Sequence, residues 1–252
     1  MQSNPNNPPR PPRPPRPPRI FDEAAEFHSE GTTSLSKNFV ANVFSWMVVG
    51  LVVTSVVAWY GASTGLYANL MLSGGIMPWV LMLSPFAFII AMNAGLEKFS
   101  ATTLTMMFLA FSACMGLSLS SVFLVYGLGS VFQVFAITAG TFTVMAIAGY
   151  TTSIDLTRMG SLLFMGLIGI ILASVVNWFI GSETIEFIVS ILGVLIFTGL
   201  IAYKTQNIKR IAASIDNESA AASKIAILTA TSIYLSFINL FIFLLRLLGN
   251  RN

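Results

Sequence analysis

The chain has 252 residues, of which 55% are hydrophobic and only 9% charged, and its mean hydropathy is +0.80. Soluble domains carry about 25% charged residues, so this composition excludes a soluble globular protein and predicts a polytopic membrane protein. The formal charge of +3 and the pI of about 9.2 do not by themselves indicate an anionic partner, because most basic residues fall in the N-terminal segment and in short connections. The single cysteine excludes an intramolecular disulfide.

The first 37 residues form a polar tail in two parts. Residues 1–19 hold nine of the eleven prolines, with arginines at positions 10, 13, 16 and 19, and this Pro-Pro-Arg pattern predicts an extended, disordered tract. We expect a solvated topology anchor, with docking on an aromatic groove or on anionic lipid as the alternatives. Residues 20–37 are acidic and hold the only histidine, His28. The sequence therefore predicts a cytoplasmic tail over 1–37 and a transmembrane domain over 38–252.

Seven apolar segments follow, each close to the roughly 20 residues that a helix needs to cross a bilayer. Pro78 and Pro85 interrupt the second segment, and we expect Pro85 to kink it. The connections are short except for residues 204–224, so the chain leaves no room for a soluble catalytic domain. The prediction is an all-α integral membrane protein with seven transmembrane helices, which span residues 41–62, 77–94, 101–126, 131–149, 160–181, 185–203 and 225–248.

Basic residues beside the predicted crossings set the orientation. Eleven lysines and arginines fall in the tail and in alternate connections, whereas the opposite side has only Arg246 and Arg251. Lysine and arginine concentrate on the cytoplasmic side of membrane proteins. This asymmetry predicts a cytoplasmic N-terminus and an external C-terminus, and the short connections suit a bacterial inner membrane.

The last apolar segment, residues 224–249, is predicted to lie at the centre of the bundle. Polar side chains recur on one of its faces at helical spacing, while the other faces are aliphatic or aromatic. Hydroxyl and amide groups in hydrocarbon need partners from other helices or from water, so a lipid-facing helix has no reason to gather them. Six helices are then expected to pack around this seventh one. The polar face consists of Thr229, Ser232, Ser236 and Asn239, and Phe243 and Arg246 continue its line.

Small and hydroxylated residues recur in the third to fifth segments. In the fifth, Gly166, Gly169 and Ala173 share one side and predict a close packing seam that ends at Asn177. In the third and fourth, the hydroxyls either bond their own helix backbone, which we favour, or line a water-filled route beside the polar face of the last helix. These hydroxyls belong to Ser112, Ser118, Ser120, Ser121, Thr138, Thr141 and Thr143.

Catalytic and cofactor motifs are missing from the sequence. The stretch from Gly116 to Ser121 has a serine arrangement that could suggest an intramembrane nucleophile, but the only histidine lies in the tail, so a Ser-His site is disfavoured. No HExxH, paired cysteines or Gly-rich phosphate loop occurs, and no aspartate or glutamate lies inside a predicted span. We therefore predict no enzyme activity, no cofactor, no metal site and no nucleic-acid partner.

A series of motifs runs through the last five predicted helices. They read Gly116-Leu-Ser-Leu-Ser-Ser-Val-Phe-Leu-Val-Tyr126, Gly149-Tyr-Thr-Thr152 with Asp155-Leu-Thr157, Met165-Gly-Leu-Ile-Gly169, Gly193-Val-Leu-Ile-Phe-Thr-Gly199, Ala202-Tyr-Lys-Thr-Gln-Asn-Ile-Lys209, and Phe237-Ile-Asn-Leu-Phe241 with Leu244-Leu-Arg-Leu-Leu-Gly249. With these motifs the chain closely resembles the bacterial branch of the Bax inhibitor family, also called the lifeguard or transmembrane Bax inhibitor motif family, over residues 38–249.

The resemblance implies a seven-helix bundle with the last helix at its centre. It also implies a leak pathway for calcium or other small cations and, for bacterial relatives, association with a membrane-bound protease complex. The lipid bilayer, calcium or other small cations, and other membrane proteins are therefore the candidate partners.

The sequence departs from the family at two positions. Where the family has two aspartates that share a proton and gate the pore by pH, this chain has Lys204, in Tyr203-Lys-Thr-Gln206, and Ser236, in Leu235-Ser-Phe-Ile-Asn239. A lysine and a hydroxyl cannot form such a carboxylate pair, and a lysine repels calcium. Two alternatives follow for Lys204: a latch that hydrogen-bonds Ser236 or backbone carbonyls, or an ammonium that extends to the interface without a specific partner.

Arg246 matches an arginine that the family places after its second aspartate. An arginine near the outer end of a central helix needs a partner or water, so we expect an ion pair with Glu183 or Glu186, with interfacial snorkelling of Arg246 as the alternative. The leading functional prediction is a Bax-inhibitor-like leak protein for calcium or small cations that lacks the aspartate-pair pH gate. The alternative is a non-conducting scaffold or regulator that acts through protein partners such as a membrane protease complex.

Overall fold

The computed structural model describes residues 19–72, 75–215 and 220–250. Eight α-helices make up most of these ranges, which confirms the predicted all-α class. The Pro/Arg-rich residues 1–18 lie outside the described residues. The helices are α1 Arg19–Ser63, α2 Leu66–Leu72, α3 Met77–Ala94, α4 Ala101–Val125, α5 Leu128–Thr151, α6 Thr157–Ile180, α7 Glu183–Ser214 and α8 Ala220–Leu248.

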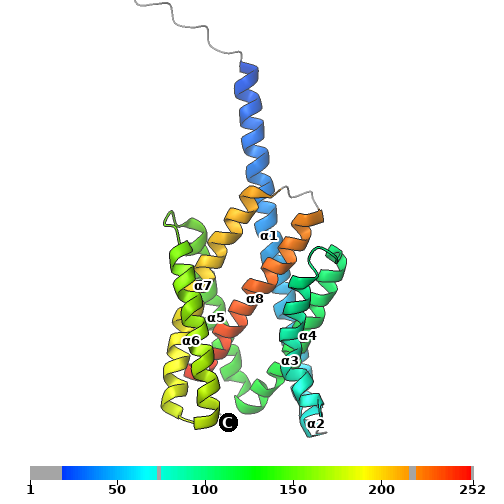
Figure 1. Ribbon diagram of the computed structural model, residues 1–252, viewed down its shortest axis with the longest axis vertical. Coiled ribbons are helices and arrows are strands. Elements are labelled where there is room, and N and C mark those ends of the chain that lie inside the picture. The colour runs from blue at the N-terminus through cyan, green and yellow to red at the C-terminus, as the bar shows by residue number, and fades with distance from the viewer. Residues whose placement is uncertain (1–18, 73–74, 216–219, 251–252) are drawn as a thin grey trace, which may run out of the picture.

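Helix α1 begins before the predicted transmembrane domain. The acidic segment 20–37, expected as part of the tail, is helical and continuous with the first apolar span. Figure 1 shows α1 extending well beyond the other helices.

Six helices in the described residues are long and apolar enough to cross a membrane, and they correspond to six of the seven predicted spans. The second predicted span, 77–94, forms α3. The apolar part of α3 covers only Leu83–Ala94 and is shorter than the other six spans. Pro85 lies inside α3 and removes one backbone hydrogen bond of the helix. The seventh crossing is therefore not confirmed. The six spans are Asn38–Ser63, Ala101–Val125, Leu128–Thr151, Thr157–Ile180, Glu183–Ser214 and Ala221–Leu248.

The predicted long connection 204–224 is mostly helical, which corrects the sequence-based boundaries. Helix α7 continues to Ser214 and α8 begins at Ala220. The charges of Lys204, Lys209 and Arg210 suggested a loop. The residues of this stretch nevertheless include lysine, arginine, glutamine and alanine, which are all good helix formers. The extension places three basic side chains on a helix rather than on a flexible connection.

Helix α8 is the most enclosed of the membrane helices. Its apolar window is 61% buried, against 11% to 39% for the other five spans, and α8 packs against α1, α4, α5 and α7. Helix α3 packs mainly on α4, and α6 on α7, so the two lie on opposite sides of α8 (Figure 1). The structure supports a central α8 surrounded by four helices, but the predicted ring of six is not confirmed.

Close helix contacts occur where small residues meet backbone. A Cβ at Gly116 would meet the backbone of Thr54, and a Cβ at Gly149 would meet the backbone of Ala202. These glycines let α4 approach α1 and let α5 approach α7. The predicted seam on α6 is only partly formed, because a Cβ at Gly169 would meet nothing within 4 Å.

Candidate functional site

The polar face of α8 lies along three neighbouring cavities. We call them the α7–α8 cavity, of 180 Å³, the central cavity, of 610 Å³, and the Arg246 cavity, of 410 Å³. Thr229 and Ser232 line the first, Ser236 and Asn239 line the second, and Arg246 lines the third. The stripe that the sequence predicted therefore lies along these three hollows.

Neighbouring cavities share lining residues. Lys204 lines both the α7–α8 cavity and the central cavity, and Ser174 of α6 lines both the central cavity and the Arg246 cavity. Each cavity far exceeds the roughly 30 Å³ that one water molecule occupies in the liquid. Together they form a candidate route for water and small polar solutes along α8.

Lys204 and Ser236 meet where the route passes between two cavities. The Lys204 ammonium donates hydrogen bonds to the Ser236 hydroxyl, at 2.8 Å, and to the Ser232 carbonyl, at 2.9 Å. Ser236 donates its own hydroxyl to the Ser232 carbonyl at 3.3 Å. The ammonium thus joins α7 to both a side chain and the backbone of α8. Its position matches the hydrogen-bonded alternative weighed for Lys204, while a role in gating stays a prediction.

The described residues that line the two cavities of this ammonium include no carboxylate. Among the described residues that line the central and α7–α8 cavities, Lys204 is the only charged one. Nor do His, Cys, Asp and Glu side chains gather into a possible metal site anywhere in the described ranges. The local field at the junction is therefore positive, which favours anions and opposes divalent cations.

An aromatic pair narrows the other end of the central cavity. The rings of Phe197 and Phe243 stack with centroids 5.8 Å apart and an interplanar angle of 28°. A Cβ at Gly193 would meet the Phe243 ring, so this glycine makes room for it. The Arg246 guanidinium lies 5.7 Å from the centre of the same ring, within the range of a cation–π contact. Phe243 therefore separates the central cavity from Arg246.

The outer ion pair predicted for Arg246 would lie in the Arg246 cavity. Arg246 and Glu186 line it together with Asn177, whose side-chain oxygen accepts a hydrogen bond from the Ser182 N–H at 3.0 Å. Glu183 is exposed in the first turn of α7 and does not line this cavity. The structure thus brings Glu186 to the same hollow as Arg246, and the ion pair itself stays a prediction.

The hydroxyls of α4 and α5 mostly bond their own helices. Ser112, Ser118 and Ser120 donate to carbonyls four residues earlier, as do Thr138, Thr141 and Thr143. This arrangement agrees with the structural alternative that the sequence favoured. Ser118 differs from the other five because its side chain also lines the central cavity.

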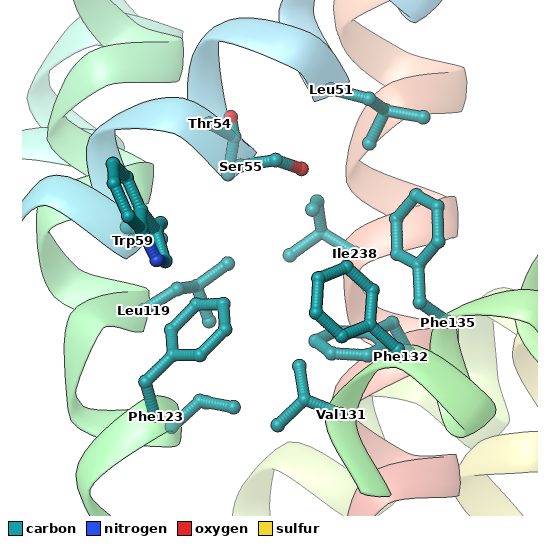
Figure 2. A pocket seen from close by; sticks show the side chains of 13 residues that line it. Leu51, Thr54, Ser55, Trp59, Leu119, Phe123, Val131, Phe132, Phe135 and Ile238 are labelled. Carbon is teal, nitrogen blue, oxygen red and sulfur yellow. The ribbon is translucent and has the colours of Figure 1, made fainter. Parts of the chain in front are cut away.

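A separate apolar cavity of 160 Å³ lies among α1, α4, α5 and α8 (Figure 2). Figure 2 shows Trp59, Phe123, Phe132 and Phe135 around it, with Ile238 from α8. An apolar cavity of this size, about 150 Å³, stays dry in other proteins. It is therefore unsuited to ions and does not belong to the polar route.

Tyr234 and Thr54 form a buried polar contact that sequence reasoning missed. The Tyr234 hydroxyl lies 2.6 Å from the Thr54 hydroxyl, and Thr54 in turn donates to the Ser112 carbonyl at 2.9 Å. Tyr234 is fully buried, and Phe108 and Phe111 contact its ring edge to face. The sequence signal that could have indicated this contact is the tyrosine within the most enclosed helix, since a buried phenol needs a hydrogen-bond partner.

A charged cluster joins the α5–α6 connection to α7. Arg210 bonds Asp155 at 2.5 Å and the Thr157 hydroxyl at 2.6 Å, and Gln206 bonds the backbone at Ile154 and Leu156. The hydrogen bond from Arg210, followed by those from Thr157, holds the pKa of Asp155 well below its usual range. Two residues of the recognised motifs, Asp155 and Gln206, therefore hold a loop against α7.

The family model described as "Inhibitor of apoptosis-promoting Bax1" matches residues 36–252. The chain belongs to the Bax inhibitor family. The resemblance inferred from the motifs is thereby confirmed, and the match covers all six apolar spans in full.

Bacterial relatives cover nearly the same length. The chain is 43% identical to the "Inner membrane protein YbhL" of Escherichia coli strain K12 over 216 residues, which are 85% of this chain and 92% of the relative. It is 42% identical to an uncharacterized protein of Borreliella burgdorferi, over 86% and 94% of the two chains. A Rickettsia prowazekii protein is 36% identical, over 87% and 95%. This member of the Bax inhibitor family is an integral membrane protein.

Proposed function

We propose that this chain is a leak protein of Bax inhibitor type whose route for calcium or small cations rests closed at Lys204. The observation that carries the proposal is the position of the ammonium. It occupies the junction of two cavities and is bonded to the Ser236 hydroxyl and the Ser232 carbonyl of α8. A cation that followed the polar face of α8 would have to pass this charge.

Electrostatics explains why the junction opposes cations. At about 6 Å and an effective dielectric constant of about 20, an ammonium repels a divalent cation by on the order of 5 kcal/mol. No carboxylate among the described residues lining the central and α7–α8 cavities offsets this repulsion. The usual pair of family aspartates would attract a cation at the same place and titrate with pH. With Lys204 and Ser236 there, the proposed route lacks that pH response.

We propose a bacterial inner-membrane location with seven crossings, a cytoplasmic N-terminus and an external C-terminus. The Escherichia coli relative is named as an inner membrane protein. Figure 1 places the α1 N-terminal end and the C-terminus at opposite ends of the bundle, as an odd number of crossings requires. Helix α3 runs between these two ends and would supply the seventh crossing.

The same lysine favours a second candidate function. A bundle whose central helix is joined to α7 by a charged hydrogen bond is suited to a non-conducting scaffold or regulator that binds other membrane proteins, such as a membrane protease complex. In that case the fold persists while ion flow is lost. Ion flux separates this candidate from the leak protein.

Calcium entry into proteoliposomes that contain a calcium dye tests the proposal. We would compare the native chain with the double variant Lys204→Asp/Ser236→Asp at acidic and alkaline pH, with Lys209→Asp as a control that makes the same Lys→Asp charge reversal elsewhere on α7. The expected result is a silent native chain, a silent control and a pH-dependent leak in the double variant. A silent double variant that is correctly folded would favour the scaffold, and a native chain that leaks freely would contradict closure at Lys204.

A further inference from the structure

The central cavity combines one positive charge with a mainly apolar wall. Lys204 is its only charged lining residue among those described, and Ser118, Ser174, Ser236 and Asn239 are its other polar ones. The remaining lining residues are aliphatic or aromatic, apart from Pro85 and Met115. A route for bare ions does not need such a wall. A pocket with a few polar groups and a large apolar surface is typical of sites for amphipathic organic ligands.

The Lys204 ammonium has capacity for a ligand. An ammonium carries three N–H bonds, and Lys204 uses two of them on Ser232 and Ser236. Asn239, one turn beyond Ser236 on α8, adds an amide to the same cavity. A charge in such surroundings calls for a counter-charge or water. The polar end of the cavity therefore matches a small anionic head that accepts hydrogen bonds.

The cavity is bounded by helices that lie apart. Phe86 and Ile89 of α3 form one wall and Leu167 and Ile171 of α6 form another, while α3 packs mainly on α4 and α6 on α7. Figure 1 shows α3 and α6 on opposite sides of α8. Phe86 and Ile171 are exposed at the surface of these apolar helices, where the bilayer is the solvent. A ligand can thus enter sideways from the hydrocarbon.

We infer that the central cavity binds one long-chain carboxylate, a fatty-acid anion, taken from the membrane. Its carboxylate accepts hydrogen bonds from Lys204 and Asn239, and its chain lies along Leu167, Phe197 and Ile242. Occupation of the cavity would obstruct the ion route, a consequence that rests on the proposed function. Binding itself does not require that the route conducts.

A free fatty acid fits this site better than a phospholipid. The head end of the cavity lies inside the bundle, beside Leu200 and Leu235. A carboxylate is compact and has two acceptor oxygens for one ammonium and one amide. A phospholipid head would bring further polar groups next to apolar side chains, where unpaired polar groups are costly. The separate apolar cavity in Figure 2 has no charged lining residue and offers no such head site.

Binding of labelled oleate to the purified full-length chain in detergent tests this inference. We expect about one oleate per chain, with at least about tenfold weaker binding in Lys204→Met, because a charge-assisted hydrogen bond is lost. Lys209→Met is the matched control and should bind oleate normally. The Lys209 ammonium donates a hydrogen bond to the Tyr150 carbonyl at 3.0 Å and does not line the cavity. Oleyl alcohol, which has the same chain without charge, should bind the native chain weakly and be insensitive to Lys204→Met.

A second measurement uses the native chain alone and so does not depend on whether variants fold. A photoreactive diazirine fatty acid should label cavity residues of α3, α6 and α7, and excess oleate should suppress that labelling. Equal oleate binding by the native chain and Lys204→Met, or labelling confined to the α1 and α5 surface, would overturn the inference. Displacement of oleate by phosphatidylglycerol at lower concentration, or by acetate alone, would also overturn it. Intact oleate binding by the native chain, together with a folded but silent Lys204→Asp/Ser236→Asp variant in the calcium assay, would instead count only against the proposed leak.

Discussion

Thr54 of α1 and Tyr234 of α8 share a hydrogen bond of 2.6 Å although 180 residues separate them in the sequence. Thr54 gives its own hydrogen to the Ser112 carbonyl, so the Tyr234 hydroxyl is the donor in this pair. Both side chains are buried. The contact therefore joins α1, α4 and α8 at the apolar side of the central helix, away from the polar route.

This arrangement predicts unequal effects of removing either hydroxyl. Thr54→Val leaves a buried phenol without its acceptor and should lower the free energy of unfolding by about 1–3 kcal/mol, whereas Tyr234→Phe should cost only about 1 kcal/mol. The double variant should be little worse than Thr54→Val, because the shared bond is lost only once. Thermal unfolding in detergent measures all three. Fully additive losses would show that the two hydroxyls do not interact.

Two glycines of α5 provide a matched pair for testing helix packing. Gly149→Ala would place a methyl group against the Ala202 backbone of α7 and should destabilise the protein by about 1–3 kcal/mol. Gly140→Ala meets nothing within 4 Å and should be neutral or stabilising by up to about 1 kcal/mol, because alanine is the better helix former. Melting temperatures in detergent check both. A tolerated Gly149→Ala would contradict the close approach of α5 and α7.

The Asp155–Arg210 pair predicts a pH dependence at the α5–α6 connection. The pKa of Asp155 is depressed in the folded protein, chiefly by the hydrogen bond from Arg210, so its contribution to stability is present above the ordinary aspartate pKa of about 3.9. That contribution falls as pH drops below about 4. The stability difference between the native chain and Asp155→Asn should therefore be constant from about pH 5 to 8 and shrink in more acidic buffers.

The control for this pH prediction is Glu97→Gln, which removes an exposed carboxylate from the α3–α4 connection rather than from the Arg210 pair. Thermal unfolding at a series of pH values should show the acid-dependent difference only for Asp155→Asn. A difference that persists unchanged down to about pH 2 would mean that the charge of Asp155 contributes nothing.

Periodicity in the sequence anticipated the polar face of α8, because a central helix must segregate its polar groups whatever its neighbours are. Helix α3 covers residues 77–94 as the sequence predicted, with Pro85 inside it, and only its length as an apolar crossing is not confirmed. Helix α7 was drawn too short because Lys204 and Lys209 suggested a loop by charge, although both favour helices. The contact between Thr54 and Tyr234 depends on how distant helices pack, so no local pattern could indicate it.

The contact between Lys204 and Ser236 could be predicted only in part. The family resemblance brought the two positions together, and a lysine's three donors made a hydrogen bond to Ser236 one of two alternatives. The structure adds that the ammonium also bonds the Ser232 carbonyl and stands between two cavities. These cavities could not be predicted from the sequence, because they depend on the separation of α3 from α6 and on the volumes left by many side chains.

Removal of the single charge at Lys204 tests the central claim most directly. Calcium entry into proteoliposomes would be measured for the native chain, Lys204→Met and Lys209→Met at one neutral pH. We expect the native chain and Lys209→Met to be silent and Lys204→Met to admit calcium at least about tenfold faster, since a repulsion of several kcal/mol is lost at the junction. Equal entry through all three folded proteins would contradict closure of the route by the Lys204 ammonium.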